Sequence, residues 1–139
     1  MIAIIRITGQ VGLDRDVVET FNRLNLPRKY SCIVLTNPTE ERLGMLKKLY
    51  SFVAYGEISK ETFSQLMEKR AKLIDKTKKT DLVKVQEELI KGKKFQDSNL
   101  KPFFSLHPPR GGIKAKVHFP KGVLGDNKEK INDLILRML

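Results

Sequence analysis

The sequence predicts an α+β fold, because short apolar runs alternate with amphipathic helical patterns in its first 57 residues. Apolar, largely β-branched runs occupy residues 2–8, 31–36 and 52–57, as is typical of short strands. Between these runs, apolar residues recur at helical spacing after two capping residues, Asp14 and Thr39. The connections are short enough for a compact sheet, so we expect a β-α-β-α-β core with both helices on one face.

The first of these helices is predicted to begin after Asp14 and to end before Pro27, which cannot continue a helix. Its apolar side consists of Val17, Val18, Phe21 and Leu24. The second helix follows the turn Asn37-Pro38-Thr39, and its apolar side consists of Leu43, Met45, Leu46 and Leu49. Both patterns are expected for helices that pack on a sheet.

Residues 58–139 are predicted to pack on this core as an elaboration, because the chain contains no internal repeat and no low-complexity linker. We therefore expect one domain over residues 1–139, with the β-α-β-α-β core in residues 1–57. The elaboration begins with a basic helical insertion of two amphipathic helices. The first of these helices is expected to begin after Ser59. The second is expected to begin at Thr80 or Asp81 and to end at Gly92.

The rest of the elaboration is predicted to be a C-terminal hairpin and a closing helix. Residues 103–106 and 113–119 flank a Pro/Gly loop as the two arms of an extended hairpin. Residues 122–127 then lead into the last helix, whose apolar side consists of Ile131, Leu134, Ile135 and Met138.

The composition favours a polyanionic partner. The chain of 139 residues is 40% hydrophobic, so it can bury a real core. Lys and Arg number 27 against 16 Asp and Glu, which gives a formal charge of +11 and a pI near 9.8. The excess positive charge is +2 in residues 1–57, +5 in residues 58–95 and +4 in residues 96–139. Nucleic acid fits this balance. No apolar run of about 18 residues and no leader is visible, so we expect a soluble, cytoplasmic protein without a membrane partner.

No pattern in the sequence predicts catalysis or a metal site. Cys32 lies within an apolar run and is expected to be a buried small hydrophobe. With one cysteine and two distant histidines, His107 and His118, zinc-ligand spacing is absent. Adjacent acids such as Glu40 and Glu41 diverge by about 100° on a helix, so they do not converge on a substrate. We expect no enzymatic activity, no cofactor and no metal.

One loop leaves a different function open. Residues 9–12, Gly-Gln-Val-Gly, follow a strand and precede a capped helix, where backbone amides and the helix dipole can receive a phosphate. The loop lacks the third glycine of a dinucleotide fingerprint and the ending of a P-loop, and Asp14 and Asp16 nearby would repel phosphate. The alternative function is therefore a ferredoxin-like regulatory or enzymatic domain that binds a phosphorylated ligand at Gly9–Gly12.

The Pro/Gly loop is the strongest candidate for presenting positive charge. Pro108 and Pro109 fix φ, whereas Gly111 and Gly112 can take positive φ and let another backbone approach. Arg110 lies between these pairs, and a guanidinium at such a tip suits bidentate contact with phosphate or a guanine edge. Two lysines follow the loop, Lys114 and Lys116.

Four motifs along the chain lead to a family: Arg6-Ile7-Thr8-Gly9, Asn22-Arg23-Leu24-Asn25-Leu26, Leu106 with Pro109-Arg110-Gly111-Gly112, and Lys130-Ile131-Asn132-Asp133-Leu134-Ile135. Together they resemble the family of large-subunit ribosomal protein thirty, which is related to the eukaryotic large-subunit protein seven. The chain is most similar to the archaeal type, because strand residues begin at Ile2 where eukaryotic members carry a long basic extension. Residues 12–16 are less basic than the early loop of bacterial members, so we expect no strong RNA contact there.

The resemblance implies a ferredoxin-like core and a structural role in the large ribosomal subunit, in the cytoplasm. Its implied partners are 23S-type ribosomal RNA, 5S ribosomal RNA and neighbouring large-subunit proteins, with no small-molecule substrate. The residues expected to bind RNA are Arg110, Gly111, Gly112, Lys114 and Lys116 in the loop, Arg28, Lys29, Lys47 and Lys48 at the core, and Lys76, Lys78 and Lys79 in the insertion.

Two further features bear on this interpretation. Phe103, Phe104 and Phe119 offer stacking surface for bases, but their hairpin setting favours packing against the sheet. A DNA-binding protein that uses the basic helices would need a recognition helix with clustered Arg, Asn and Gln at its start, and none is visible.

Overall fold

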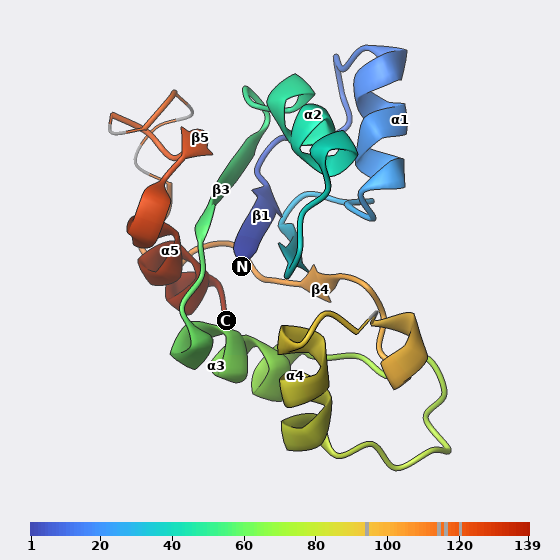
Figure 1. Cartoon of the computed structure of the whole chain (residues 1–139). Coiled ribbons are helices and arrows are strands. Elements are labelled where there is room, and N and C mark those ends of the chain that lie inside the picture. The colour runs from blue at the N-terminus through green and yellow to red at the C-terminus, as the bar shows by residue number, and fades with distance from the viewer. Residues whose placement is uncertain (94, 114, 116, 120) are drawn as a thin grey trace.

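A computed structural model describes residues 1–139 except Lys94, Lys114, Lys116 and Pro120 (Figure 1). In chain order the elements are β1 (Ile2–Arg6), α1 (Arg15–Arg23), β2 (Ser31–Leu35), α2 (Glu40–Lys48), β3 (Val53–Glu57), α3 (Lys60–Arg70), α4 (Leu82–Ile90), the 3-10 helix η1 (Gln96–Ser98), β4 (Phe104–Ser105), β5 (Gly125–Asp126), the 3-10 helix η2 (Lys128–Lys130) and α5 (Ile131–Met138). The predicted α+β class and the predicted β-α-β-α-β order of the core are confirmed.

The strands form one mixed sheet in the order β4-β2-β1-β3-β5. β1 is antiparallel to both β2 and β3, so that Ile4 lies opposite Ile33 on one side and Tyr55 on the other. β2 and β3 therefore run parallel with β1 between them, and α2 connects them. The two edge strands come from the second part of the chain: β4 pairs with β2, and β5 runs parallel to β3.

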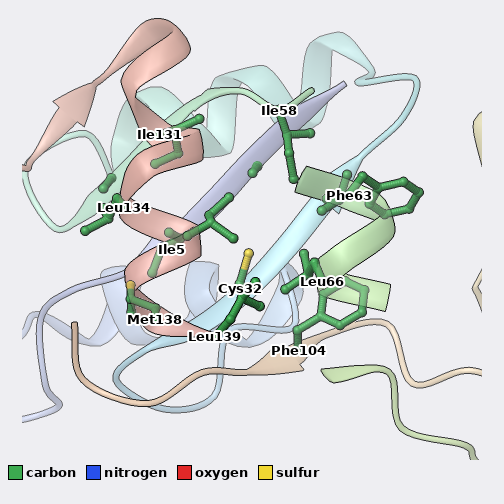
Figure 2. Packing of buried hydrophobic residues seen from close by; sticks show 14 of the residues in the cluster. Ile5, Cys32, Ile58, Phe63, Leu66, Phe104, Ile131, Leu134, Met138 and Leu139 are labelled. Carbon is green, nitrogen blue, oxygen red and sulfur yellow. The ribbon is translucent and has the colours of Figure 1, made fainter. Parts of the chain in front are cut away.

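Side chains alternate along the strands and give the sheet two buried faces. On one face, Ile4 packs with Phe21 of α1 and Leu46 of α2, as predicted for helices on one face of the core. On the other face, Ile5 and Cys32 pack with α3 and α5 (Figure 2). The sheet is thus a layer covered on both faces, and its five-residue central strand contributes to both cores.

The predicted helix starts are largely confirmed by capping hydrogen bonds. The side chain of Thr39 accepts from the backbone N–H of Arg42, that of Ser59 from Thr62, and that of Asp81 from Val83. Asp14 occupies the capping position of α1, but its side chain makes no capping hydrogen bond. After α4, Gly92 has a φ of 102°, a left-handed conformation that ends the helix where the sequence predicted.

The predicted C-terminal hairpin is wrong in its pairing. Phe104 lies opposite Cys32 of β2, and the Leu106 N–H donates to the Tyr30 carbonyl at 3.1 Å, so the first arm extends the sheet instead. In the described part of residues 113–119, backbone hydrogen bonds run to Val123 and Leu124. Two physical reasons favour this outcome: β2 offers an edge with unpaired backbone groups, and the prolines between the arms cannot donate to a ladder.

Arg6 is a charged residue in the interior, with a relative exposure of 1%. Its Nη1 donates to the Leu26 carbonyl at 2.8 Å and its Nε to the Thr8 carbonyl at 3.0 Å. The guanidinium carbon lies 4.0 Å from the centre of the Phe21 ring. Burial lowers the pKa of Arg6, but a guanidinium stays protonated in proteins. Arg6 therefore ties the end of β1 to the segment before β2.

We expect replacement of Arg6 by Met to lower the free energy of unfolding by about 2–4 kcal/mol, because the Leu26 and Thr8 carbonyls lose a charged donor. Urea unfolding measures the change. The matched control is Arg23→Ala, which removes an exposed ion pair with Glu19 at 2.7 Å and should cost at most about 1 kcal/mol. Equal unfolding midpoints for the two variants would contradict the structural role of Arg6.

A second pair of variants tests the packing of β3 against η2. A Cβ on Gly56 would collide with the backbone carbonyl of Lys128, which cannot rotate away as a side chain could. We expect Gly56→Ala to destabilise the protein by about 1–3 kcal/mol. Gly44 lies within α2 with no atom near its Cβ position, so Gly44→Ala should stabilise by up to about 1 kcal/mol. Thermal unfolding of both variants measures the two effects. An unfolding midpoint for Gly56→Ala equal to that of the wild type would refute the close contact.

Candidate nucleic-acid interface

The Pro/Gly loop is a compact turn with an exposed cation at its tip. Pro109 is buried, whereas Arg110 is exposed. The Gly112 N–H donates to the Pro109 carbonyl at 3.1 Å and closes the turn. Gly111 and Gly112 have φ values of 81° and 75°, the positive values that the sequence predicted for them. The loop therefore has a defined shape that presents the Arg110 side chain to solvent.

The last turn of α5 holds this loop in place. The Arg110 N–H donates to the Arg137 carbonyl at 3.0 Å, and the His107 N–H donates to the Met138 carbonyl at 3.2 Å. In return, the Arg137 guanidinium donates to the Gly112 carbonyl at 3.3 Å. Carbonyls at the end of a helix lack partners within it, so the loop supplies donors that α5 needs. A second guanidinium thereby joins Arg110 at the loop.

The structure brings Arg28 and Lys29 next to the start of this loop. Both are exposed in the turn that leads into β2, and the Tyr30 carbonyl of that turn accepts from the Leu106 N–H at 3.1 Å. The Lys29 ammonium lies 5.0 Å from the centre of the Tyr30 ring. The predicted cations of the loop and the predicted cations Arg28 and Lys29 of the core thus lie along the same edge, which β4 forms.

Two further lysines lie on this edge. The Lys72 ammonium donates to the Ser105 hydroxyl at 3.4 Å, and the Lys101 N–H donates to the Lys72 carbonyl at 2.9 Å. We call the exposed residues Arg28, Lys29, Lys72, Lys101, Arg110 and Arg137 the β4-edge basic surface. Lys72, Lys101 and Arg137 were not among the residues predicted to bind RNA. For Lys101, an available signal was the absence of any acid from residues 98–112.

The other predicted cations lie on two separate surfaces or outside the described residues. Lys47 and Lys48 are exposed in the last turn of α2. Lys76, Lys78 and Lys79 are exposed in the connection between α3 and α4, at the end of the molecule away from α1 and α2 (Figure 1). Lys114 and Lys116 lie outside the described residues. The predicted residues therefore do not form one continuous patch.

Comparison with known proteins shows which family the chain belongs to. No protein-family model matches the sequence. The chain is 38% identical to large ribosomal subunit protein uL30 of Archaeoglobus fulgidus, with 99% of each chain covered. It is 38% identical to the uL30 protein of Methanococcus maripaludis, with 99% of this chain and 98% of the relative covered. For the uL30 protein of Caldivirga maquilingensis the identity is 34%, with 100% of this chain and 91% of the relative covered.

The chain belongs to the uL30 family of ribosomal proteins. The resemblance to large-subunit ribosomal protein thirty, of archaeal type, is thereby confirmed, as is the ferredoxin-like α+β core. Proteins of this family are structural rather than enzymatic, so the prediction of a non-enzymatic protein is confirmed as well.

The loop at residues 9–12, which carries the alternative function, differs from a phosphate cradle. Val11 is 98% exposed at its tip, and Asp14 and Asp16 are exposed beside it. The Gly9 carbonyl accepts from Arg6, and the Gln10 side chain donates to the Pro27 carbonyl at 3.3 Å. Two carboxylates and an apolar tip are a poor match for phosphate, in agreement with membership of the uL30 family.

A cavity of about 380 Å³ lies elsewhere, where β2 extends beyond β4. Its lining includes Ile33, Asn37 and Arg42 but none of residues 9–12. Within the described residues, no group of three His, Cys, Asp or Glu side chains could hold a metal ion. No helix in the same part of the chain has the length and apolar character to cross a membrane.

Cys32 and Phe104 pack in the interior, as the sequence predicted. Cys32 is fully buried, and burial raises the pKa of its thiol to about 12, so the thiol is neutral and unreactive at physiological pH. Phe104 is buried against Phe95, with ring centres 5.9 Å apart. Phe119 is half-buried, and the Lys130 ammonium lies 5.6 Å from its ring centre. Cys32 and Phe104 therefore offer no open reactive or stacking surface to a ligand.

Proposed function

We propose that the protein is a structural constituent of the large ribosomal subunit that binds ribosomal RNA through the β4-edge basic surface. Its partners would be 23S-type ribosomal RNA, 5S ribosomal RNA nearby, and neighbouring large-subunit proteins. The observation that carries the proposal is the convergence of six exposed cations along one edge of the sheet. Membership of the uL30 family supports it independently.

Binding would proceed by neutralisation of phosphates and release of their counterions. Arg110 and Arg137 suit this role because a guanidinium can contact two phosphate oxygens at once. The loop is already hydrogen-bonded to α5, so little backbone freedom remains to be lost on binding. A shaped, charged loop of this kind fits a groove of folded RNA, which proteins recognise mainly by shape and backbone contacts.

The predicted domain organisation belongs to the same proposal. We infer that residues 1–139 act as one domain in which residues 58–139 elaborate the core of residues 1–57. Support comes from β4 and β5, which lie in the later segment and extend the sheet of the earlier one at both edges. The RNA-binding edge would then depend on both segments.

A comparison of RNA with DNA tests the proposal. The protein should bind ribosomal RNA of the large subunit more tightly than duplex DNA of equal length at equal salt, because RNA offers the folded shape. Equal affinity for both polymers at several salt concentrations would indicate nonspecific attraction between charges and would overturn the proposal.

Within the proposed surface, we expect Arg110→Ala and Lys29→Ala each to lower the slope of log affinity against log salt by about 0.7–0.9, one phosphate contact apiece. The thermal unfolding midpoint should not change, because both side chains are exposed. Arg23→Ala serves as the control, since Arg23 is an exposed cation on α1 that is already paired with Glu19. A lowered unfolding midpoint with an unchanged salt slope would mean that the loop has only a structural role.

A further inference from the structure

Tyr50 and His118 form an exposed aromatic stack at the edge of the sheet opposite β4. Their ring centres are 4.5 Å apart and their planes differ by 18°. Tyr50 directly follows α2 and its capping residue Leu49, whereas His118 precedes β5 by seven residues. Tyr50 is 42% exposed and His118 is exposed as well. Two side chains distant in sequence thus present an aromatic surface to solvent.

The backbone around the stack holds both rings in position. A Cβ on Gly125 would lie 3.0 Å from the Tyr50 ring, so this glycine lets the ring rest on the β5 backbone. Tyr55 on β3 contacts Tyr50 edge to face, with ring centres 6.3 Å apart. On the other side, the Gly122 N–H donates to the His118 carbonyl at 3.1 Å. The stack is therefore preorganised.

The surroundings of the stack are rich in positive charge. Lys47 and Lys48 are exposed in the last turn of α2, and the Tyr50 N–H lies 3.4 Å from the Lys47 carbonyl that it donates to. Lys121 is exposed in the turn that carries His118. Asp126 on β5 is an acid in the same region, and its side chain accepts from the Lys128 N–H at 2.9 Å. Lys47, Lys48 and Lys121 thus supply exposed cations close to the stack in sequence.

Exposed aromatic rings beside lysines match the chemistry of an unpaired nucleotide. Every base has a π-face that stacks on Tyr or His, and its phosphates need neighbouring cations. A stack whose purpose is internal packing would bury its rings, as Phe104 does elsewhere in this protein. We propose that the Tyr50–His118 stack receives one unpaired base of ribosomal RNA. The base stacks on the exposed part of this aromatic pair, while Lys47 and Lys48 contact adjoining phosphates.

This inference rests on the proposed function, since it names a second contact of the same partner. It gives Lys47 and Lys48 a place in binding although they lie away from the β4-edge basic surface. Contacts at opposite edges of the sheet would let the protein bridge two segments of folded RNA.

The test measures affinity for large-subunit ribosomal RNA and its salt dependence for four variants. His118→Ala should weaken binding about 5- to 100-fold with an unchanged salt slope, because stacking is lost and no phosphate contact is. His118→Phe keeps an aromatic face and should bind within about threefold of wild type. Lys47→Ala should instead lower the salt slope, and Arg23→Ala on α1 should change neither quantity.

The outcomes separate this inference from the proposed function. Failure of the wild-type protein to bind ribosomal RNA would overturn both. Normal binding by His118→Ala, together with weakened binding by Arg110→Ala, would overturn the stacking inference alone. A measurement on the wild-type protein does not depend on whether a variant folds. Diethyl pyrocarbonate should modify His118 in the free protein but not in assembled large subunits. Equal modification in both states would also overturn the inference.

Discussion

The position of β1 at the centre of the sheet is the constraint on which the rest of the structure depends. Its five residues pair with β2 on one side and β3 on the other, and both of its faces are covered. Helices α1 and α2 close one face, while α3 and α5 close the other. A strand buried in this way accepts apolar side chains almost exclusively, which explains the run Ile-Ala-Ile-Ile. Arg6 is the exception, and backbone carbonyls satisfy it.

Because helices cover both faces of the sheet, positive charge is exposed on the outer sides of the helices and at the edges of the sheet. The two edges are completed by short strands from the second part of the chain, β4 and β5. The segments that flank β4 and β5 add further cations to these edges, including Arg110 beside the end of α5 and Lys121 in the turn before β5. In the proposed function, the elaboration of residues 58–139 therefore converts a small buried sheet into a protein with two RNA-binding edges.

Features set by neighbouring residues could be predicted from the sequence, whereas features set by distant partners could not. Ser59 and Asp81 cap helices a few residues away, so their positions follow from local chemistry. The pairing of Phe104 with Cys32 joins residues 72 positions apart, and the predicted hairpin failed because it assumed a local partner. The burial of Arg6 and the stack of Tyr50 on His118 also depend on such long-range contacts.

The candidate site also combines features set by neighbouring residues with features set by distant partners. The positive φ values at Gly111 and Gly112 and the exposure of Arg110 follow from the local run of Pro and Gly. The approach of Lys72 to Ser105 required the fold, because it depends on where the strand after α4 meets the connection after α3. Local composition thus identified the loop, and only the tertiary structure could assemble the β4-edge basic surface around it.

Sedimentation of the native protein from its own cell lysate tests the central claim most directly, with and without ribonuclease and at moderate and raised salt. The account predicts migration with the large ribosomal subunit, loss of that migration after ribonuclease treatment, and gradual release as salt rises. A slow peak of monomer or dimer size that ribonuclease does not affect would contradict it.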